Sequence, residues 1–327
     1  MASNIPFRTR FVGHSDSVAE LSFSPNGESG HYLASVGRDG LGIVRCCGTG
    51  QIVSSLKGHQ GPVSGVSFGA NAPIVATGSE DRTARIWSAT SGHELEQFRH
   101  KNMVASVALD TESKRLLTSS RQHDAKIRLY DVNQSQECLS VYRKNRRGVR
   151  NVIFCREDRS FIASSYDRTV ELWDISSGKV SHQISLPHHA KSLELCADGK
   201  TVTIGYGESI VFFNAETFDI LGHHRMLFKV MGASLHPQKR SFVSADNKGF
   251  IYKFDYDTGH LQYKFKSHIQ AGDNVTNVKY SPDGEMYASC STDGLITFWP
   301  QTAENEHYSE DSVTYISSDS NDEDYDP

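Results

Sequence analysis

Residues 58–87 read GHQGPVSGVSFGANAPIVATGSEDRTARIW, and this stretch contains the pattern that decides the fold. Val63–Phe68 alternates apolar with polar residues, as a half-buried β-strand does. Two further short strands are predicted at Ile74–Thr77 and Ala84–Trp87, with a turn at Asp81 between them. A Ser-Gly turn then leads to a fourth strand. The stretch therefore predicts a small sheet of four short strands.

The same pattern recurs along the chain. Gly13-His14 precedes Gly58-His59 by 45 residues, and aspartates follow at steps of 42, 43 and 43, with a further one in the last copy: Asp39, Asp81, Asp124, Asp167 and Asp293. Six residues after each aspartate stands Arg45, Trp87, Tyr130, Trp173 or Trp299, and Phe213 and Phe254 continue the aromatic series. A fixed period of this kind indicates a repeat architecture, here of seven copies of roughly 43 residues.

Four short strands alone expose their edges, and radial repetition covers them. The sequence therefore predicts an all-β fold, a seven-bladed β-propeller. Buried histidine and aspartate side chains need hydrogen-bond partners, so we expect them to tie the loops of each blade together with hydroxyl and indole groups. The residues assigned to this structural network are His14, Asp39, His59, Asp81, Trp87, Asp124, Asp167, Trp173, Asp293 and Trp299. The pattern is identified as the WD repeat.

The last copy lacks a fourth strand, because Pro300 follows Trp299 directly. Ile5–Val12 lies before the first copy and has the alternation of a strand, so we expect it to close the ring as the outer strand of the last blade. Three blades depart from the repeat, with Arg45 at the tryptophan position of blade 1 and Gly207 or Lys248 at the aspartate position of blades 5 and 6. We expect incomplete networks there.

Charge divides the chain into a propeller at 1–300 and a tail at 301–327. The tail has nine acidic residues and no lysine or arginine, whereas the formal charge of the whole chain is −5. Such a segment is predicted to be disordered. Ser320 precedes Asn321-Asp322-Glu323 and resembles a site for an acidophilic kinase; the alternative is a purely solubilising tail.

Much of the positive charge of the body is predicted to lie on one face, where the Gly-His connections and the aspartate turns meet. The candidate partner-binding residues are Arg38, Arg82, Lys101, Arg143, Lys144, Arg146, Arg147 and Arg168. Such a face suits acidic peptides, phosphates or, transiently, the acidic tail of the chain itself. The alternative is that these are solvated turn residues.

Signals for catalysis are weak, and we predict no enzyme activity, no cofactor and no small-molecule substrate. The chain has no phosphate-binding loop, nucleophile elbow or zinc-protease motif. The pairs His188-His189, His223-His224 and Cys46-Cys47 are adjacent residues, which point to opposite sides of a strand, so no metal site is expected. No apolar run is long enough to span a membrane, and the scattered cysteines indicate an intracellular protein.

Several stretches resemble the serine-threonine kinase receptor-associated protein family, also called the unr-interacting protein family. The most specific lie in the irregular blades 5 and 6: Tyr206-Gly207-Glu208-Ser209-Ile210, Ala233-Ser234-Leu235-His236-Pro237 and Tyr252-Lys253-Phe254-Asp255-Tyr256. The resemblance implies a cytoplasmic and nuclear adaptor of the survival motor neuron complex, which loads Sm proteins onto spliceosomal small nuclear RNAs alongside Gemin-type proteins. It also implies roles in translation and in transforming growth factor β signalling.

Two alternatives stay open beside this reading. Subunit i of translation initiation factor three is also similar, and its likeness would imply a scaffold in translation. The basic face could instead contact RNA directly, although Tyr142 and Tyr166 are the aromatic residues near it that could stack on bases. We expect any RNA contact to be weak or indirect.

Overall fold

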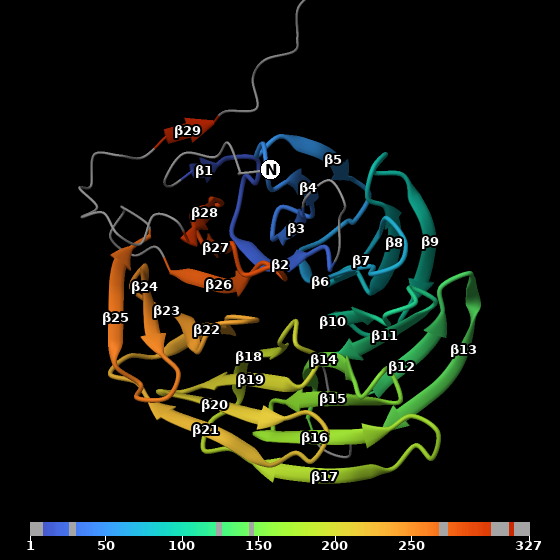
Figure 1. Ribbon diagram of the computed structural model, residues 1–327. Helices are drawn as coiled ribbons and strands as arrows, with labels where there is room; N and C mark the ends of the chain where they lie inside the picture. Colours follow the sequence, from blue (N-terminus) through green and yellow to red (C-terminus); the bar gives the residue numbers. More distant parts are fainter. Residues whose placement is uncertain are drawn as a thin grey trace, which may run out of the picture.

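Seven antiparallel sheets stand around one axis like the blades of a propeller, as Figure 1 shows. The computed structural model describes residues 9–25, 31–121, 126–143, 147–267, 274–301 and 314–316. The predicted fold class, an all-β seven-bladed propeller, is confirmed. Nowhere in these ranges is there a helix that is long and apolar enough to cross a membrane.

In each of blades 1 to 6, four strands follow one another in the sequence and pair in that order from the axis outward. Blades 1 and 2 contain β2 (Val18–Phe23), β3 (Tyr32–Gly37), β4 (Gly42–Cys46), β5 (Ile52–Leu56), β6 (Val63–Phe68), β7 (Ile74–Ser79), β8 (Thr83–Ser88) and β9 (Glu94–Arg99). Blades 3 and 4 contain β10 (Val104–Leu109), β11 (Arg115–Ser120), β12 (Lys126–Asp131), β13 (Gln134–Arg143), β14 (Val149–Cys155), β15 (Ser160–Ser165), β16 (Thr169–Asp174) and β17 (Val180–Ser185). Blades 5 and 6 contain β18 (Ala190–Leu195), β19 (Thr201–Tyr206), β20 (Ser209–Asn214), β21 (Ile220–Arg225), β22 (Val230–Leu235), β23 (Ser241–Asp246), β24 (Phe250–Asp255) and β25 (Leu261–Lys266).

Blade 7 joins the two ends of the chain. It contains β26 (Val275–Tyr280), β27 (Met286–Ser291) and β28 (Ile296–Pro300), and its fourth strand is β1 (Thr9–Phe11), antiparallel to β28. The predicted closure by the N-terminal segment is therefore confirmed for residues 9–11, while residues 1–8 lie outside the described part of the chain. From the tail, β29 (Thr314–Ile316) pairs in parallel with β1. Gln301 is also described and is 7% exposed, while the predicted disorder of the rest of the tail concerns undescribed residues and stays a prediction.

Apolar side chains fill the spaces between neighbouring blades. One cluster, for example, joins Val44 and Leu56 of blade 1 to Val66, Phe68 and Trp87 of blade 2. Because both faces of every sheet are covered in this way, the second strands are almost wholly buried. The fourth strands form the rim of the ring and expose apolar residues such as Leu95 and Ile220.

The inner edges of the sheets are tied by side chains from the preceding blade. Ser22 Oγ accepts a hydrogen bond from the Phe68 amide at 3.0 Å, and Ser67 Oγ accepts one from the Leu109 amide at 3.0 Å. Glu20 Oε2 accepts from the Val66 amide at 3.1 Å. An open strand edge exposes unpaired amides, so these side chains satisfy donors that sheet pairing leaves free.

Candidate functional site

Antiparallel strands bring two kinds of connection to one end of the ring. These are the segments that lead into the first strand of each blade and the turns between its second and third strands. We call this end the loop face. Its described residues are 12–17, 38–41, 57–62, 80–82, 100–103, 121, 147–148, 166–168, 186–189, 207–208, 226–229, 247–249, 267, 274 and 292–295.

The described cations that the sequence assigned to partner binding lie at the loop face and are exposed. Arg38, Arg82 and Arg168 stand in the turns, and the last two have φ angles of 70° and 71°. Lys101 lies in the connection into β10, and Arg147 lies in the connection into β14. Arg143 is the last residue of β13, directly before that second connection. Asp124, Lys144, Arg146 and Ser320 lie outside the described residues. The role of these cations in partner binding stays a prediction.

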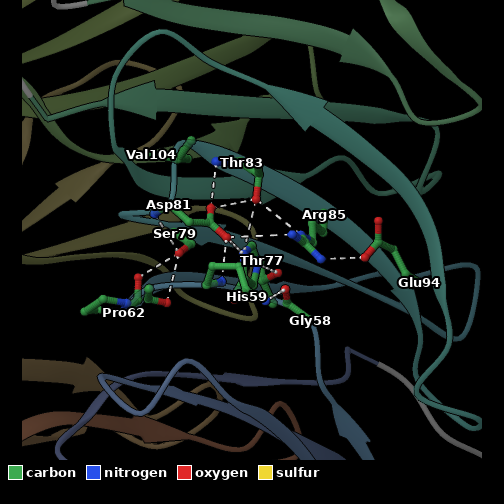
Figure 2. A network of polar contacts seen from close by, with 12 residues as sticks. Gly58, His59, Pro62, Thr77, Ser79, Asp81, Thr83, Arg85, Glu94 and Val104 are labelled. Atoms are coloured by element: carbon green, nitrogen blue, oxygen red, sulfur yellow. Dashed lines mark hydrogen bonds and ion pairs between the residues drawn. The ribbon is translucent and has the colours of Figure 1, made fainter.

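The histidine–aspartate network is most complete in blade 2, as Figure 2 shows. His59 Nδ1 lies 2.7 Å from Asp81 Oδ2, and His59 Nε2 lies 2.8 Å from Thr77 Oγ1. Trp87 Nε1 donates to the same Thr77 hydroxyl at 2.8 Å. Burial opposes ionisation of Asp81, but the hydrogen bonds from His59 and Thr83 outweigh it and lower the pKa of the carboxyl. The network thus joins the connection, the turn and two strands of one blade.

Other blades use parts of this network. In blade 1, His14 Nδ1 lies 2.9 Å from Asp39 Oδ2 and Nε2 lies 2.9 Å from Ser35 Oγ. In blade 4, Asp167 Oδ1 accepts from the Thr169 hydroxyl at 2.6 Å, and Trp173 donates to Glu171 at 3.1 Å. In blade 7, Asp293 accepts from the Leu295 amide and Trp299 donates to Ser289 at 3.0 Å.

Two of the networks expected to be incomplete have substitutes. In blade 6 the carboxylate comes from Asp246, which is 1% exposed and accepts from the Lys248 amide and, at 2.9 Å, from the Tyr252 hydroxyl. The repeat position itself is Lys248, as the sequence shows, and the acid that takes its place stands two residues earlier on β23. In blade 1, Arg45 is buried and donates to the carbonyls of Val12 and Gly50. This arginine ties blade 1 to the segment that follows the closing strand.

Blade 5 does lack the carboxylate. Gly207 has a φ of +51°, and a Cβ there would lie 2.5 Å from the His188 ring. Glycine allows this close approach because it has no side chain. In the ring of seven blades, this turn is held by packing of the histidine instead of by an acid.

In blade 3 the histidine position is taken by His100, whose surroundings keep it neutral. Its Nδ1 accepts a hydrogen bond of 3.3 Å from Arg128. Burial and the nearby Arg128 charge lower the pKa of His100 to about 3.

We expect His100→Gln to reduce the loss of stability that occurs between pH 7 and pH 5. An unfolded histidine binds a proton below about pH 6.5, whereas folded His100 does not until about pH 3. Folding stability therefore falls by up to about 1.4 kcal/mol per pH unit below pH 6.5 from this residue. Urea unfolding midpoints at the two pH values measure the effect, with the exposed His223→Gln as control. An unchanged pH dependence in His100→Gln would contradict the assignment.

A β-bulge recurs at the same place in all seven blades, at the second residue of the first strand. The bulge residues in order are Ala19, Ser64, Ala105, Arg150, Lys191, Met231 and Thr276. Bulges redirect side chains, and two hydroxyls show the direction here. Ser64 Oγ donates to the Val104 carbonyl and Thr276 Oγ1 to the Val18 carbonyl, each on the first strand of the next blade. Arg150 and Lys191 are the two charged members, and they are in adjacent blades.

Around these two residues lies a group that we call the Arg150 cluster: Arg121, Arg150, Tyr166, His189 and Lys191. Arg121 donates to the Tyr166 hydroxyl at 3.1 Å and to Glu80 Oε1 at 2.7 Å. The Arg150 guanidinium carbon lies 5.7 Å from the centre of the Tyr166 ring. The centres of the His189 and Tyr166 rings are 5.8 Å apart. The cluster thus joins blades 3, 4 and 5 beside the axis of the ring.

The cations of the Arg150 cluster disfavour one another. Burial is the largest cause that lowers the pKa values of Arg150, His189 and Lys191, and neighbouring positive charges add to it. The pKa of Tyr166 is also lowered, because hydrogen bonds and charges from Arg121 and Arg150 outweigh its burial. These shifts indicate a local excess of positive charge.

Deeper along the axis are two buried carboxyls. Burial raises the pKa of Glu20, with Lys279 and Arg150 acting against it. Burial likewise raises the pKa of Glu194 to about 7, again opposed by Lys279. These groups balance part of the positive charge below the Arg150 cluster.

The sequence analysis named Tyr166 and His189 singly but did not bring them together, and it missed Arg121 and Lys191. The signal that could have found the cluster is the repeat itself. Taking the second residue of each first strand yields three uncharged residues, then Arg150 and Lys191 in succession, then two more uncharged residues.

The opposite end of the ring has a hollow of about 400 Å³ between blades 3 and 4. Its carboxylates are mostly paired: Asp110 with Arg115 at 2.8 Å and Glu112 with Lys114 at 2.7 Å. Among the described residues, no three histidine, cysteine, aspartate or glutamate side chains gather to hold a metal ion. The basic loop face is therefore the better candidate site.

Comparison with known proteins agrees with this architecture. Residues 6–41, 50–88, 136–174 and 259–300 match the family model described as WD domain, G-beta repeat. With its seven blades and histidine–aspartate bonds, the protein is thus a WD-repeat propeller, a class of protein-binding scaffold.

Full-length relatives narrow the class to a family. The chain is 33% identical over 290 residues to the serine-threonine kinase receptor-associated protein of Gallus gallus, covering 89% of this chain and 81% of the relative. The Homo sapiens protein is also 33% identical, over 287 residues, with 88% and 80% covered. The chain belongs to the serine-threonine kinase receptor-associated protein family, as the sequence predicted. Pre-mRNA-processing factor 17 of Homo sapiens is more distant, at 22% identity over 298 residues, with 88% of this chain and 51% of that protein covered.

Proposed function

We propose that this protein is a non-enzymatic scaffold that binds segments of partner proteins through its loop face. The observation that carries the proposal is the concentration of exposed arginine and lysine on that face of a WD-repeat propeller. Positive faces attract acidic segments and raise the rate of encounter.

An apolar contact point accompanies the charge. Leu227, in the connection into blade 6, has a relative exposure of 103%, while its neighbour Met226 is buried. Exposed leucines are common singly, but this one stands at the tip of a loop on the charged face. A partner segment with both acidic and apolar residues fits such a surface.

We further propose that the assembly served is the survival motor neuron complex in small nuclear ribonucleoprotein assembly, in the cytoplasm and nucleus, with Sm and Gemin-type proteins as partners. Membership of the receptor-associated protein family supports this, and so does the likeness to a protein named as a pre-mRNA-processing factor. Direct RNA binding is less well supported, because Tyr142 is buried and the Tyr166 ring already contacts Arg150 and His189.

Affinity purification from cells tests the proposal, and the double variant Arg146→Glu, Arg147→Glu is expected to capture about ten-fold less partner, because it reverses the charge of Arg147 on the loop face and that of the residue before it in the sequence. The matched control is Lys200→Glu, Lys239→Glu, which reverses two exposed charges at the opposite end. Recovery of Sm and Gemin-type proteins by the unchanged chain supports the assembly proposed, whereas recovery of initiation-factor subunits favours the translation alternative. Equal capture by both double variants would remove the loop face as the binding surface.

A further inference from the structure

The Arg150 cluster is a built group of cations, not a scatter of surface charge. Arg150 is held against the Tyr166 ring, and Arg121 is held by the Tyr166 hydroxyl and Glu80. The Nε of Arg150 is buried and has no hydrogen-bond partner among the described residues. A buried donor without a partner is costly, so the site is one that a bound acceptor would complete.

Charge counting indicates what kind of acceptor is required. Four cations act on this site, namely Arg121, Arg150, Lys191 and, through its effect on Lys191, Lys229. The carboxylates that act on Arg121 and Arg150 are Glu80 and Glu20, and Glu20 interacts more strongly with Lys279. Burial and the neighbouring positive charges lower the pKa of His189 and so disfavour its charged form. An excess of about two positive charges is therefore left beside the axis.

A phosphate monoester carries about −1.5 to −2 charges at neutral pH and three strong acceptor oxygens, whereas a carboxylate carries a single charge. Guanidinium groups bind phosphate through paired hydrogen bonds. The phosphate group therefore matches both the charge excess and the donors of the cluster better than an aspartate or glutamate does.

The surroundings favour a protein segment over a nucleic acid as the bearer of this phosphate. Nucleic acids bind to stripes of cations that follow several phosphates, but the bulge positions on either side are the uncharged Ala105 and Met231. Leu227 lies in the same connection as Lys229 and offers an apolar contact beside the cations.

We infer that the Arg150 cluster binds a phosphoserine or phosphothreonine of a partner protein, with a neighbouring apolar residue of that segment against Leu227. This inference rests on the proposed use of the loop face as a partner-binding surface. It adds that capture depends on phosphorylation of the partner.

Direct binding can be measured with a fluorescent degenerate peptide library that contains one fixed phosphoserine, and with matched libraries that carry serine or glutamate instead. The full chain is expected to bind the phosphoserine library at least about ten-fold more tightly than either. Arg150→Gln and Lys191→Gln should each lose about ten-fold or more of this affinity, since each removes a charged hydrogen bond. Lys200→Gln, at the opposite end of blade 5, is the matched control and should bind unchanged.

Lys191→Gln keeps the test valid if Arg150→Gln lowers the melting temperature, because Lys191 is only half-buried. Equal binding of the three libraries would overturn the inference, and so would unchanged binding by a folded Lys191→Gln. A single-stranded RNA oligonucleotide that bound as tightly as the phosphopeptides, with the same dependence on Lys191, would overturn it in favour of RNA.

Phosphatase treatment of the cell lysate before affinity purification separates this inference from the proposed function. If the inference holds, treatment and Lys191→Gln should each reduce capture of the partners that the unchanged chain recovers. Capture that survives both changes leaves the scaffold function standing and removes the phosphate site. Failure of the unchanged chain to recover an assembly, with phosphopeptide binding intact, removes the proposed function alone.

Discussion

Deletion of residues 1–12 is expected to abolish the cooperative unfolding of the propeller. The deletion removes β1, whose three residues Thr9, Arg10 and Phe11 are 0%, 2% and 0% exposed. Phe11 packs on Phe298 with ring centres 4.7 Å apart, and the Arg10 side chain donates to the Ser267 carbonyl at 2.7 Å. Without β1 the edge of β28 is left open, and the cluster between blades 7 and 1 loses part of its cover.

The magnitude follows from single residues. Phe11→Ala alone is expected to cost about 3–5 kcal/mol, the usual range for a buried phenylalanine. Whole domains are stable by about 5–15 kcal/mol, so loss of the complete strand removes a large part of the total. Calorimetry and near-ultraviolet circular dichroism measure the effect. Deletion of residues 1–7, which spares β1, is the control, and a deletion of 1–12 that melts like this control would contradict the role of the strand.

Asp81→Ala is expected to destabilise the protein by about 3 kcal/mol or more, because several donors lose their acceptor at once and each buried one left unsatisfied costs about 1–3 kcal/mol. The substitution leaves His59 Nδ1 without the carboxylate and also removes the acceptor of the Gln60 and Thr83 amides. The Thr77 hydroxyl is hydrogen-bonded to His59 Nε2 and accepts from the Trp87 indole. These bonds are weakened as well, because the carboxylate no longer fixes the His59 ring. Urea unfolding measures the loss.

Acidity provides a second measurement of the same bond. The folded pKa of Asp81 is lowered, so its stabilising effect is present above the unfolded value of about 3.9 and is lost as the pH falls through the folded value. The difference in the free energy of unfolding between Asp81→Ala and the unchanged protein should therefore become smaller as the solution becomes strongly acidic. Arg82→Ala, an exposed neighbour, is the control. Equal stability of the two variants at neutral pH would show that the network does not hold the blade.

The regular part of the fold could be predicted because a repeat supplies several copies of each signal. Val63–Phe68 forms a strand with the predicted limits, and the closing strand was found from the missing strand after Trp299. Residues that replace the usual members of the histidine–aspartate network could not be predicted in this way, because each occurs in one blade alone. Asp246 replaces the expected acid by accepting from the Lys248 and Phe250 amides of the turn and from the Tyr252 hydroxyl, and the last of these bonds depends on side-chain packing within the sheet.

The candidate site was predicted in part. The exposed arginines of the turns follow from topology, since antiparallel strands fix the end at which a turn lies. The Arg150 cluster depends on a bulge, which shifts the alternation of the first strand by one residue. A simple count of alternating residues therefore assigns Arg150 to the wrong side of its strand.

Pairing of Thr9 with Phe298 has a consequence for biosynthesis. β1 is made before the strands of the first six blades and its partner β28 is made after them, so β1 has no β28 to pair with while those six sheets form. Contacts between such distant parts of a chain form slowly. Until blade 7 is made, the apolar residues of blade 1 that pack against it stay exposed to solvent. Chaperones are expected to be most important during this interval.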